Sequence, residues 1–127
     1  MKLNIEKNQD CDVLVQIVKV DGYLDAHTFP DLEKVLNGMI TQGQNNIILD
    51  FETLDYISSA GLGLLLGAQR KASLQKGGLK IIHMQESIHR VFQVLGFSRI
   101  IEVCPSREAA LRAFKGNESG RTAADGT

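Results

Sequence analysis

The chain has 127 residues, of which 43% are hydrophobic, and its formal net charge is −1. This length supports one domain with one core, and the near-neutral charge gives no electrostatic basis for direct binding to nucleic acid. Cys11 and Cys104 fit neither a disulfide framework nor a metal-ligand spacing, and the longest apolar run is about half of a membrane span, so we expect a cytoplasmic protein without a bound metal.

The first two predicted elements are strands that form an antiparallel hairpin. Residues 3–7 and 13–20 have the apolar content and alternation of strands, and the polar segment 8–10 between them predicts the turn. Asp21 and Gly22 end the second strand.

A first helix is predicted from about Thr28 to Gly43. Thr28 is a residue type that caps a helix, Pro30 suits the first turn, and Gly43 ends the pattern. Five apolar residues fall on one helical face: Leu32, Val35, Leu36, Met39 and Ile40. Residues 46–51 follow as an apolar strand without alternation, which is typical of a strand covered on both faces.

The alternation of helices and strands continues to the end of the domain. We expect a second helix from about Ser59 to Gln75, a strand over 79–82, a third helix that ends at Gly96, and a short strand over 100–104. Ser106 then caps a last helix. Four apolar residues of the third helix fall at core spacing: Ile88, Val91, Phe92 and Leu95.

This order of elements predicts an α/β fold, with a mixed, mostly parallel sheet of four to five strands and about four helices. The domain is expected to cover residues 1–115. Residues 116–127 contain no apolar anchor, so we expect a disordered C-terminal tail.

Ser59 is the most informative residue of the chain, because it stands where the second helix begins. Its neighbours Ala60 and Gly61 are too small to cover its hydroxyl. A helix N-terminus carries about half a positive charge and several unpaired N–H groups, so it tolerates a phosphate well. Both a phosphorylation site and a helix N-cap fit Ser59, and Ser58 fits the N-cap role equally.

Three glycines, Gly61, Gly63 and Gly67, lie in the first half of this helix, where each costs about 1 kcal/mol relative to alanine. Either the sheet packs closely against the face that Gly63 and Gly67 share, or Gly61 keeps the surface around Ser59 flat for a partner. The spacing matches neither a dinucleotide-binding nor a Walker sequence. Ile57 stands where a nucleophile elbow requires glycine, so the residues favour neither a cofactor nor catalysis.

The segment from Tyr56 to Gly63, YISSAGLG, resembles the signature of the anti-sigma-factor antagonists, whose domain is called STAS. Residues 22–28, GYLDAHT, are similar to the Gly-x-Leu-Asp segment of that family, and residues 47–51, IILDF, lead into the signature in the family's order. The resemblance covers residues 3 to about 115 and implies the STAS fold.

The resemblance also implies a partner switch. In this family an anti-sigma factor, which is also a serine kinase of the histidine-kinase-like ATPase type, phosphorylates a serine at the start of a helix, and a metal-dependent serine phosphatase removes the phosphate. The unphosphorylated antagonist binds the kinase and frees the sigma factor. That serine corresponds to Ser59, and the family's loop acid, which helps partner recognition, corresponds to Asp25. The family often has Asp where this chain has Ser58.

On this basis we expect a phosphoprotein in signal transduction and transcription regulation, with no catalysis of its own. Its partner surface is expected to contain Asp25, Ser58, Ser59, Ala60, Gly61 and Gly63. Residues 1–57 hold four Lys/Arg and ten Asp/Glu, so this surface is acidic and selects a basic partner unless folding mixes the charges.

Two other functions fit the same sequence. One is a STAS adaptor without a phosphoswitch, for example as a subunit of a lipid-transport ATPase complex, in which Ser59 is a cap and a contact. The other is a small hydrolase that uses Ser59 as its nucleophile.

Overall fold

The computed structural model describes residues 2–10 and 13–114, so the predicted tail and Cys11 lie outside it. The elements in chain order are β1 (Lys2–Asp10), β2 (Val13–Leu24), α1 (Phe29–Thr41), β3 (Asn46–Asp50), β4 (Leu54–Ile57), α2 (Ser59–Leu74), β5 (Gly78–Ile82), α3 (Glu86–Val94), the 3₁₀ helix η1 (Phe97–Arg99) and β6 (Glu102–Cys104). A last helix occupies residues 107–114. The predicted α/β class is confirmed, and β4 is a strand beyond those expected.

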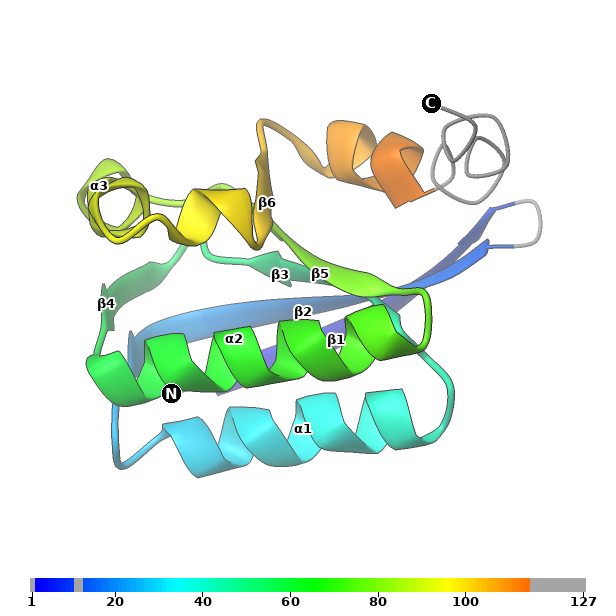
Figure 1. The fold of residues 1–127 in the computed structure, drawn as a ribbon, viewed down its shortest axis with the longest axis horizontal. Helices are drawn as coiled ribbons and strands as arrows, with labels where there is room; N and C mark the ends of the chain where they lie inside the picture. The colour runs from blue at the N-terminus through cyan, green and yellow to red at the C-terminus, as the bar shows by residue number, and fades with distance from the viewer. Residues whose placement is uncertain (1, 11–12, 115–127) are drawn as a thin grey trace.

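The six strands form a mixed, mostly parallel sheet, in which five strands have the order β1-β2-β3-β5-β6 and β4 pairs with β2 outside this order. β1 pairs antiparallel with β2, whereas the other strand pairs are parallel. The long strand β2 pairs with β3 along Gln16–Lys19 and with β4 along Gly22–Leu24. β4 therefore extends the end of β2 on the side where α2 begins (Figure 1).

Helices cover both faces of the sheet. α1 and α2 lie side by side on one face, and the helix over residues 107–114 lies on the other (Figure 1). Because side chains alternate along a strand, Val18 and Val20 of β2 reach the core beneath α1 and α2, whereas Val15 and Ile17 reach the core beneath the last helix. This two-sided burial explains why β2 and β3 are almost continuously apolar.

The turn predicted at residues 8–10 is wrong. These residues belong to β1, where Asn8 pairs with Val15 and Asp10 with Val13, and the connection to β2 falls at residues 11–12, outside the described part of the chain. β1 is an edge strand whose described side chains are largely solvent-accessible, so polar residues at its end need not mark a turn.

Two details of the predicted helices are also wrong. Thr28 holds the N-cap position of α1 but makes no side-chain cap, because its hydroxyl donates to the carbonyl of Tyr23 at 2.8 Å instead. In α3, Ile88 and Phe92 are buried, whereas Val91 is 40% and Leu95 53% exposed. This short helix lies at the end of the sheet, so it can bury one narrow face against the main core.

Candidate functional site

The candidate site lies where β2 and β4 end and α2 begins. Leu24 and Ile57 are paired in the parallel register of these strands, so the next residues, Asp25 and Ser58, leave the sheet side by side. The N–H of Ser58 donates to the carbonyl of Leu24 at 2.8 Å and ties the two chain segments together. Four of the predicted partner-binding residues follow on α2.

The two adjacent serines have different roles in this arrangement. Ser58 is the N-cap of α2: its backbone is extended, and its Oγ accepts a hydrogen bond from the N–H of Gly61 at 3.2 Å. Ser59 occupies the first turn and is exposed, and its hydroxyl has no hydrogen-bond partner within residues 2–10 and 13–114. The hydroxyl of Ser59 is therefore accessible, whereas that of Ser58 is engaged.

The glycines of α2 divide into a buried and an exposed group. Gly61 is buried, and a Cβ built on it would lie 2.8 Å from Leu24 Cγ and 3.0 Å from the Leu24 carbonyl oxygen. Gly63 and Gly67 are exposed, and a Cβ added to either of them would have no neighbouring atom within 4 Å. The structure therefore excludes close packing on the sheet at Gly63 and Gly67, which was one of the two alternatives, and shows such packing at Gly61, to which the other alternative gave a surface role.

Asp25 organises the loop between β2 and α1. Its Oδ1 accepts hydrogen bonds from the N–H of His27 at 2.9 Å and the N–H of Thr28 at 3.1 Å. Desolvation is the largest influence on the pKa of Asp25 and raises it, but the hydrogen bonds from Thr28 and His27 together outweigh desolvation and hold the pKa below its ordinary value. The carboxylate is thus ionised at neutral pH beside the start of α2.

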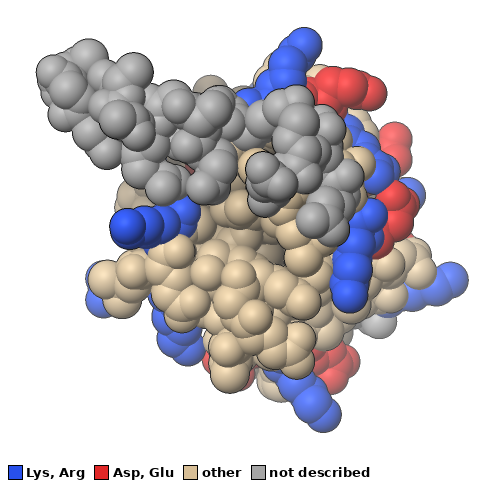
Figure 2. Space-filling view, turned by 90° about the vertical axis from the view of Figure 1, so that its right-hand side faces the viewer, with Lys and Arg blue, Asp and Glu red and all other residues tan. Residues whose placement is uncertain are grey.

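Acidic residues gather at this end of the molecule. Between Val20 and Gln69 the sequence has seven Asp/Glu and a single Lys/Arg, Lys34. The C-terminal ends of β2, β3 and β4 lie at this edge, and Asp25, Asp50 and Asp55 are at or near them. Figure 2 shows the opposite end of the molecule, where Lys and Arg lie around the visible face together with several Asp and Glu. The two signs of charge are therefore mixed at that end.

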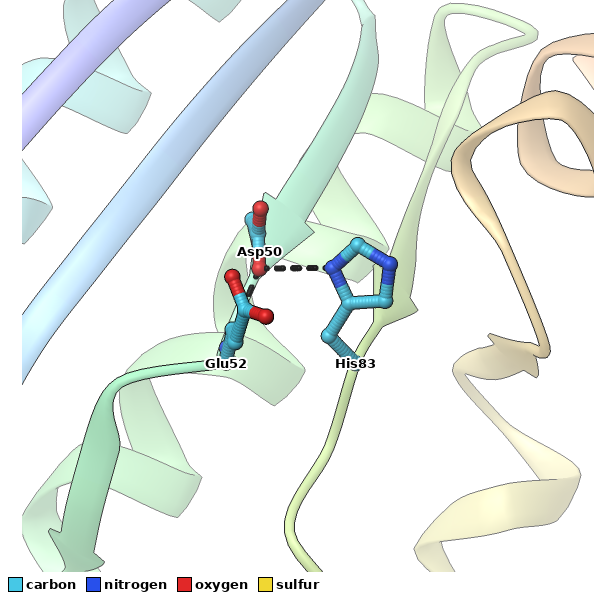
Figure 3. A group of neighbouring side chains, drawn as sticks. All are labelled: Asp50, Glu52 and His83. Carbon is cyan, nitrogen blue, oxygen red and sulfur yellow. Dashed lines mark hydrogen bonds and ion pairs between the residues drawn. The ribbon is translucent and has the colours of Figure 1, made fainter.

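One group at the same edge has the residue types of a metal site. Ligand atoms of Asp50, Glu52 and His83 lie within 4.8 Å of one another (Figure 3). However, Asp50 Oδ1 is 3.2 Å from His83 Nδ1 and accepts from the N–H of Glu52 at 3.0 Å, while Lys19 Nζ is 3.7 Å from Glu52 Oε1. The carboxylates thus have partners within the protein, and the group is a surface network of polar contacts.

Sequence reasoning missed an aromatic pair next to Asp25 and Ser58. Tyr23 and Tyr56 are neighbours on the paired strands β2 and β4, are 58% and 52% exposed, and contact edge to face with ring centroids 6.3 Å apart. The signal was present in the alternation, because the buried Leu24 and the half-buried Ile57 follow directly and turn the preceding side chains outward.

Comparisons with known proteins agree with this architecture. The family model of the STAS domain matches residues 2–110. The anti-sigma-B factor antagonist of Staphylococcus aureus is 35% identical over 103 residues, which are 81% of this chain and 94% of that protein. BtrV of Bordetella bronchiseptica, named as a candidate anti-sigma factor antagonist, is 33% identical over 115 residues, which are 91% of this chain and 96% of that protein.

Solved structures show the same fold. The anti-sigma factor antagonist SpoIIAA in its unphosphorylated form superposes with a TM-score of 0.67 at 23% identity, covering 89% of this chain and 99% of that one. The phosphorylated form of SpoIIAA from Bacillus superposes with a TM-score of 0.65 at 24% identity, covering 87% of this chain and 99% of that one. None of the helices in the described residues has the length and apolar character needed to cross a membrane.

Proposed function

The chain belongs to the STAS domain family, and we propose that it is an anti-sigma factor antagonist switched by phosphorylation of Ser59. The observation that carries this proposal is the contrast between two neighbouring hydroxyls: Ser58 caps α2, whereas Ser59 is exposed and unbonded among the described residues. A kinase can reach the Ser59 hydroxyl without opening the fold. The relatives named as antagonists support the regulatory role.

The start of α2 can accept a phosphate without refolding. The cap from Ser58 uses the N–H of Gly61, and the N–H of Leu62 donates to the Ser58 carbonyl at 2.9 Å. The N–H groups of Ser59 and Ala60 remain without a partner in the described structure, at the positive end of the helix dipole. These groups stabilise a nearby anion, so the effect of phosphorylation falls on a docked partner.

The phosphate blocks docking through its size and its hydration. It adds about −1.5 to −2 charges at neutral pH to a surface that already holds Asp25. A partner that contacts Ser59, Ala60 and Gly63 closely must desolvate this group or move away from it. A penalty of about 3 kcal/mol lowers the affinity by more than a hundredfold.

The partners in this proposal are an anti-sigma factor that is also a serine kinase of the histidine-kinase-like ATPase type, and a metal-dependent serine phosphatase. The chain is then their ligand and substrate and performs no catalysis itself. Because the kinase uses ATP, we place the switch in the cytoplasm. Asp25, Ser58, Ser59, Ala60 and Gly63 form the contact surface, and Gly61 supports it from below by packing on Leu24.

The proposal is tested with the purified serine kinases of this type from the same genome. We expect one kinase to bind the wild type and Ser59→Ala with equal affinity, and Ser59→Asp at least a hundredfold more weakly. Ser58→Asp is not a suitable control because Ser58 lies in the proposed contact surface. Ser73→Asp, at an exposed serine near the other end of α2, is the matched variant and should bind like the wild type.

Equal binding of Ser59→Asp and the wild type would contradict the switch. That result, together with a membrane ATPase complex as the partner, would favour the STAS adaptor that holds Ser59 as a contact residue.

A further inference from the structure

Tyr23 and Tyr56 form an exposed aromatic pair that the fold does not need for its core. Their rings are 58% and 52% exposed and meet at an interplanar angle of 83°. Single exposed apolar residues are ordinary on protein surfaces. Two tyrosines packed against each other on neighbouring strands present a larger, rigid surface of the kind that is enriched in protein interfaces.

The pair is continuous with the surface around Ser59. Tyr23 precedes Leu24 and Asp25, and Tyr56 precedes Ile57 and Ser58. The strand register pairs Tyr23 with Tyr56, and the Thr28 hydroxyl holds the Tyr23 carbonyl at 2.8 Å. A partner that covers the start of α2 and the Asp25 loop therefore reaches the rings along the same two strands.

The charges beside the pair favour a cationic occupant. Asp25 lies two residues after Tyr23, the interval at which side chains along a strand return to the same face, while Lys and Arg are absent from residues 20–33 and 35–69. A guanidinium group can stack on a tyrosine ring and bind a carboxylate through two hydrogen bonds at the same time. A lysine ammonium lacks the planar shape for both contacts.

We propose that Tyr23 and Tyr56 are the anchor of the partner interface and receive an arginine side chain of the kinase that recognises Ser59, with Asp25 binding its guanidinium group. This inference rests on the proposed function and names the chemistry of the partner. Two roles are thus separate at one interface. The tyrosines contribute to the affinity for the kinase, and the phosphorylation state of Ser59 determines whether the kinase can dock.

The experiment measures binding of the kinase that phosphorylates Ser59 to single variants by calorimetry. Tyr23→Thr and Tyr56→Thr remove the rings but keep residues that suit a strand, and each should weaken binding about tenfold or more. Tyr23→Phe and Tyr56→Phe keep the rings and should bind within about threefold of the wild type. Ile5→Thr, which removes a 49% exposed apolar side chain from β1, is the matched control and should bind normally.

The outcomes distinguish the inference from the proposed function. If both threonine variants bind within twofold of the wild type while Ser59→Asp still blocks binding, the anchor is wrong and the switch stands. If the threonine variants bind weakly but Ser59→Asp binds normally, the switch is wrong and the anchor stands. If no kinase of this type binds the wild type, both are wrong.

If the threonine variants do not fold, photo-crosslinking tests the inference instead. A photo-crosslinking amino acid in place of Tyr56 should join the chain to the kinase through a peptide that contains arginine. The same substitution at Ile5 should give no crosslink. Crosslinks of equal yield at the two positions would overturn the inference.

Discussion

The two sides of α2 are built from different residues for different reasons. Its buried side carries Gly61, Leu65 and Ala72, which fill the space above the sheet and beside Leu24. Its exposed side carries Ser59, Gly63 and Gly67, spaced four residues apart, with open space above both glycines. Three glycines in one helix thus arise from two causes, a close contact inside and an uncovered face outside.

This difference separates stability from recognition within a single helix. Changes on the buried side should act on the free energy of unfolding, because packed cores leave little space for added or lost atoms. Changes on the exposed side should act mainly on binding and should alter stability only through the helix propensity of the new residue. Substitutions at matched positions can test this division.

The largest effect is expected at the centre of the buried side. Leu65 is fully buried, so Leu65→Ala should lower the free energy of unfolding by about 2–5 kcal/mol through lost burial and a residual cavity. Leu74→Ala is the same change on the same helix at a residue that is 80% exposed, and it should cost less than about 0.5 kcal/mol. Urea denaturation measures both. Similar decreases in the free energy of unfolding for the two variants would contradict the distinction between the buried and exposed sides of α2.

A methyl group added to each type of glycine should have opposite effects. At Gly61 it would lie 3.0 Å from the Leu24 carbonyl oxygen, which the N–H of Ser58 holds in place, so overpacking of about 1–3 kcal/mol should outweigh the better helix propensity of alanine. Gly63→Ala meets no atom within 4 Å and should stabilise the fold by about 0.5–1 kcal/mol. Thermal unfolding of the two variants should shift in opposite directions, and a shared direction would contradict the division.

The two serines should differ by a smaller amount. Ser58→Ala removes the N-cap of α2 and should cost about 1 kcal/mol, as is typical for loss of such a cap. Ser59→Ala removes a hydroxyl without a partner in the described structure and should leave the stability within about 0.5 kcal/mol of the wild type. Chemical denaturation measures the free energy of unfolding of both variants. A larger decrease for Ser59→Ala than for Ser58→Ala would show that Ser59, not Ser58, provides the cap.

The smallest effect is the pH dependence that Asp25 contributes. Its pKa is lowered in the folded chain, so the stability from its ionised form is fully present above the unfolded pKa of about 4 and is lost as the pH falls through the lower folded value. Asp25→Asn should therefore be less stable than the wild type at pH 6, and the difference should shrink towards pH 3. A difference that stays constant between these pH values would show that the charge of Asp25 has no part in stability.

The start of α2 was predictable because its signals are local. Small and polar residues follow an apolar strand at Ser58 and Ser59, and two adjacent glycines, Gly77 and Gly78, follow the end of the helical pattern. The choice between the serines was not predictable, because it depends on the direction in which Ser58 leaves β4, where the Leu24 carbonyl binds its N–H. β4 was missed since its four residues gain their stability from pairing with the distant end of β2.

The roles of the glycines show where helical spacing is informative. Residues 59, 63 and 67 share one face of a helix, so an exposed Ser59 places Gly63 and Gly67 on the exposed side as well. The sequence contained this relation, and it disfavours the alternative in which Gly63 and Gly67 pack on the sheet. The closeness of Gly61 to Leu24 depends on the register between β2 and β4 and has no local signal.

The most direct measurement of the phosphorylation switch is site-resolved mass spectrometry of the intact chain isolated from its own cells, before and after phosphatase treatment. We predict a phosphate on Ser59 that the phosphatase removes, and no phosphate on Ser58. A Ser59→Ala chain from the same cells should be unmodified in this segment. Phosphate on Ser58 alone, or modification of the Ser59→Ala chain to the same extent as the wild type, would contradict the switch.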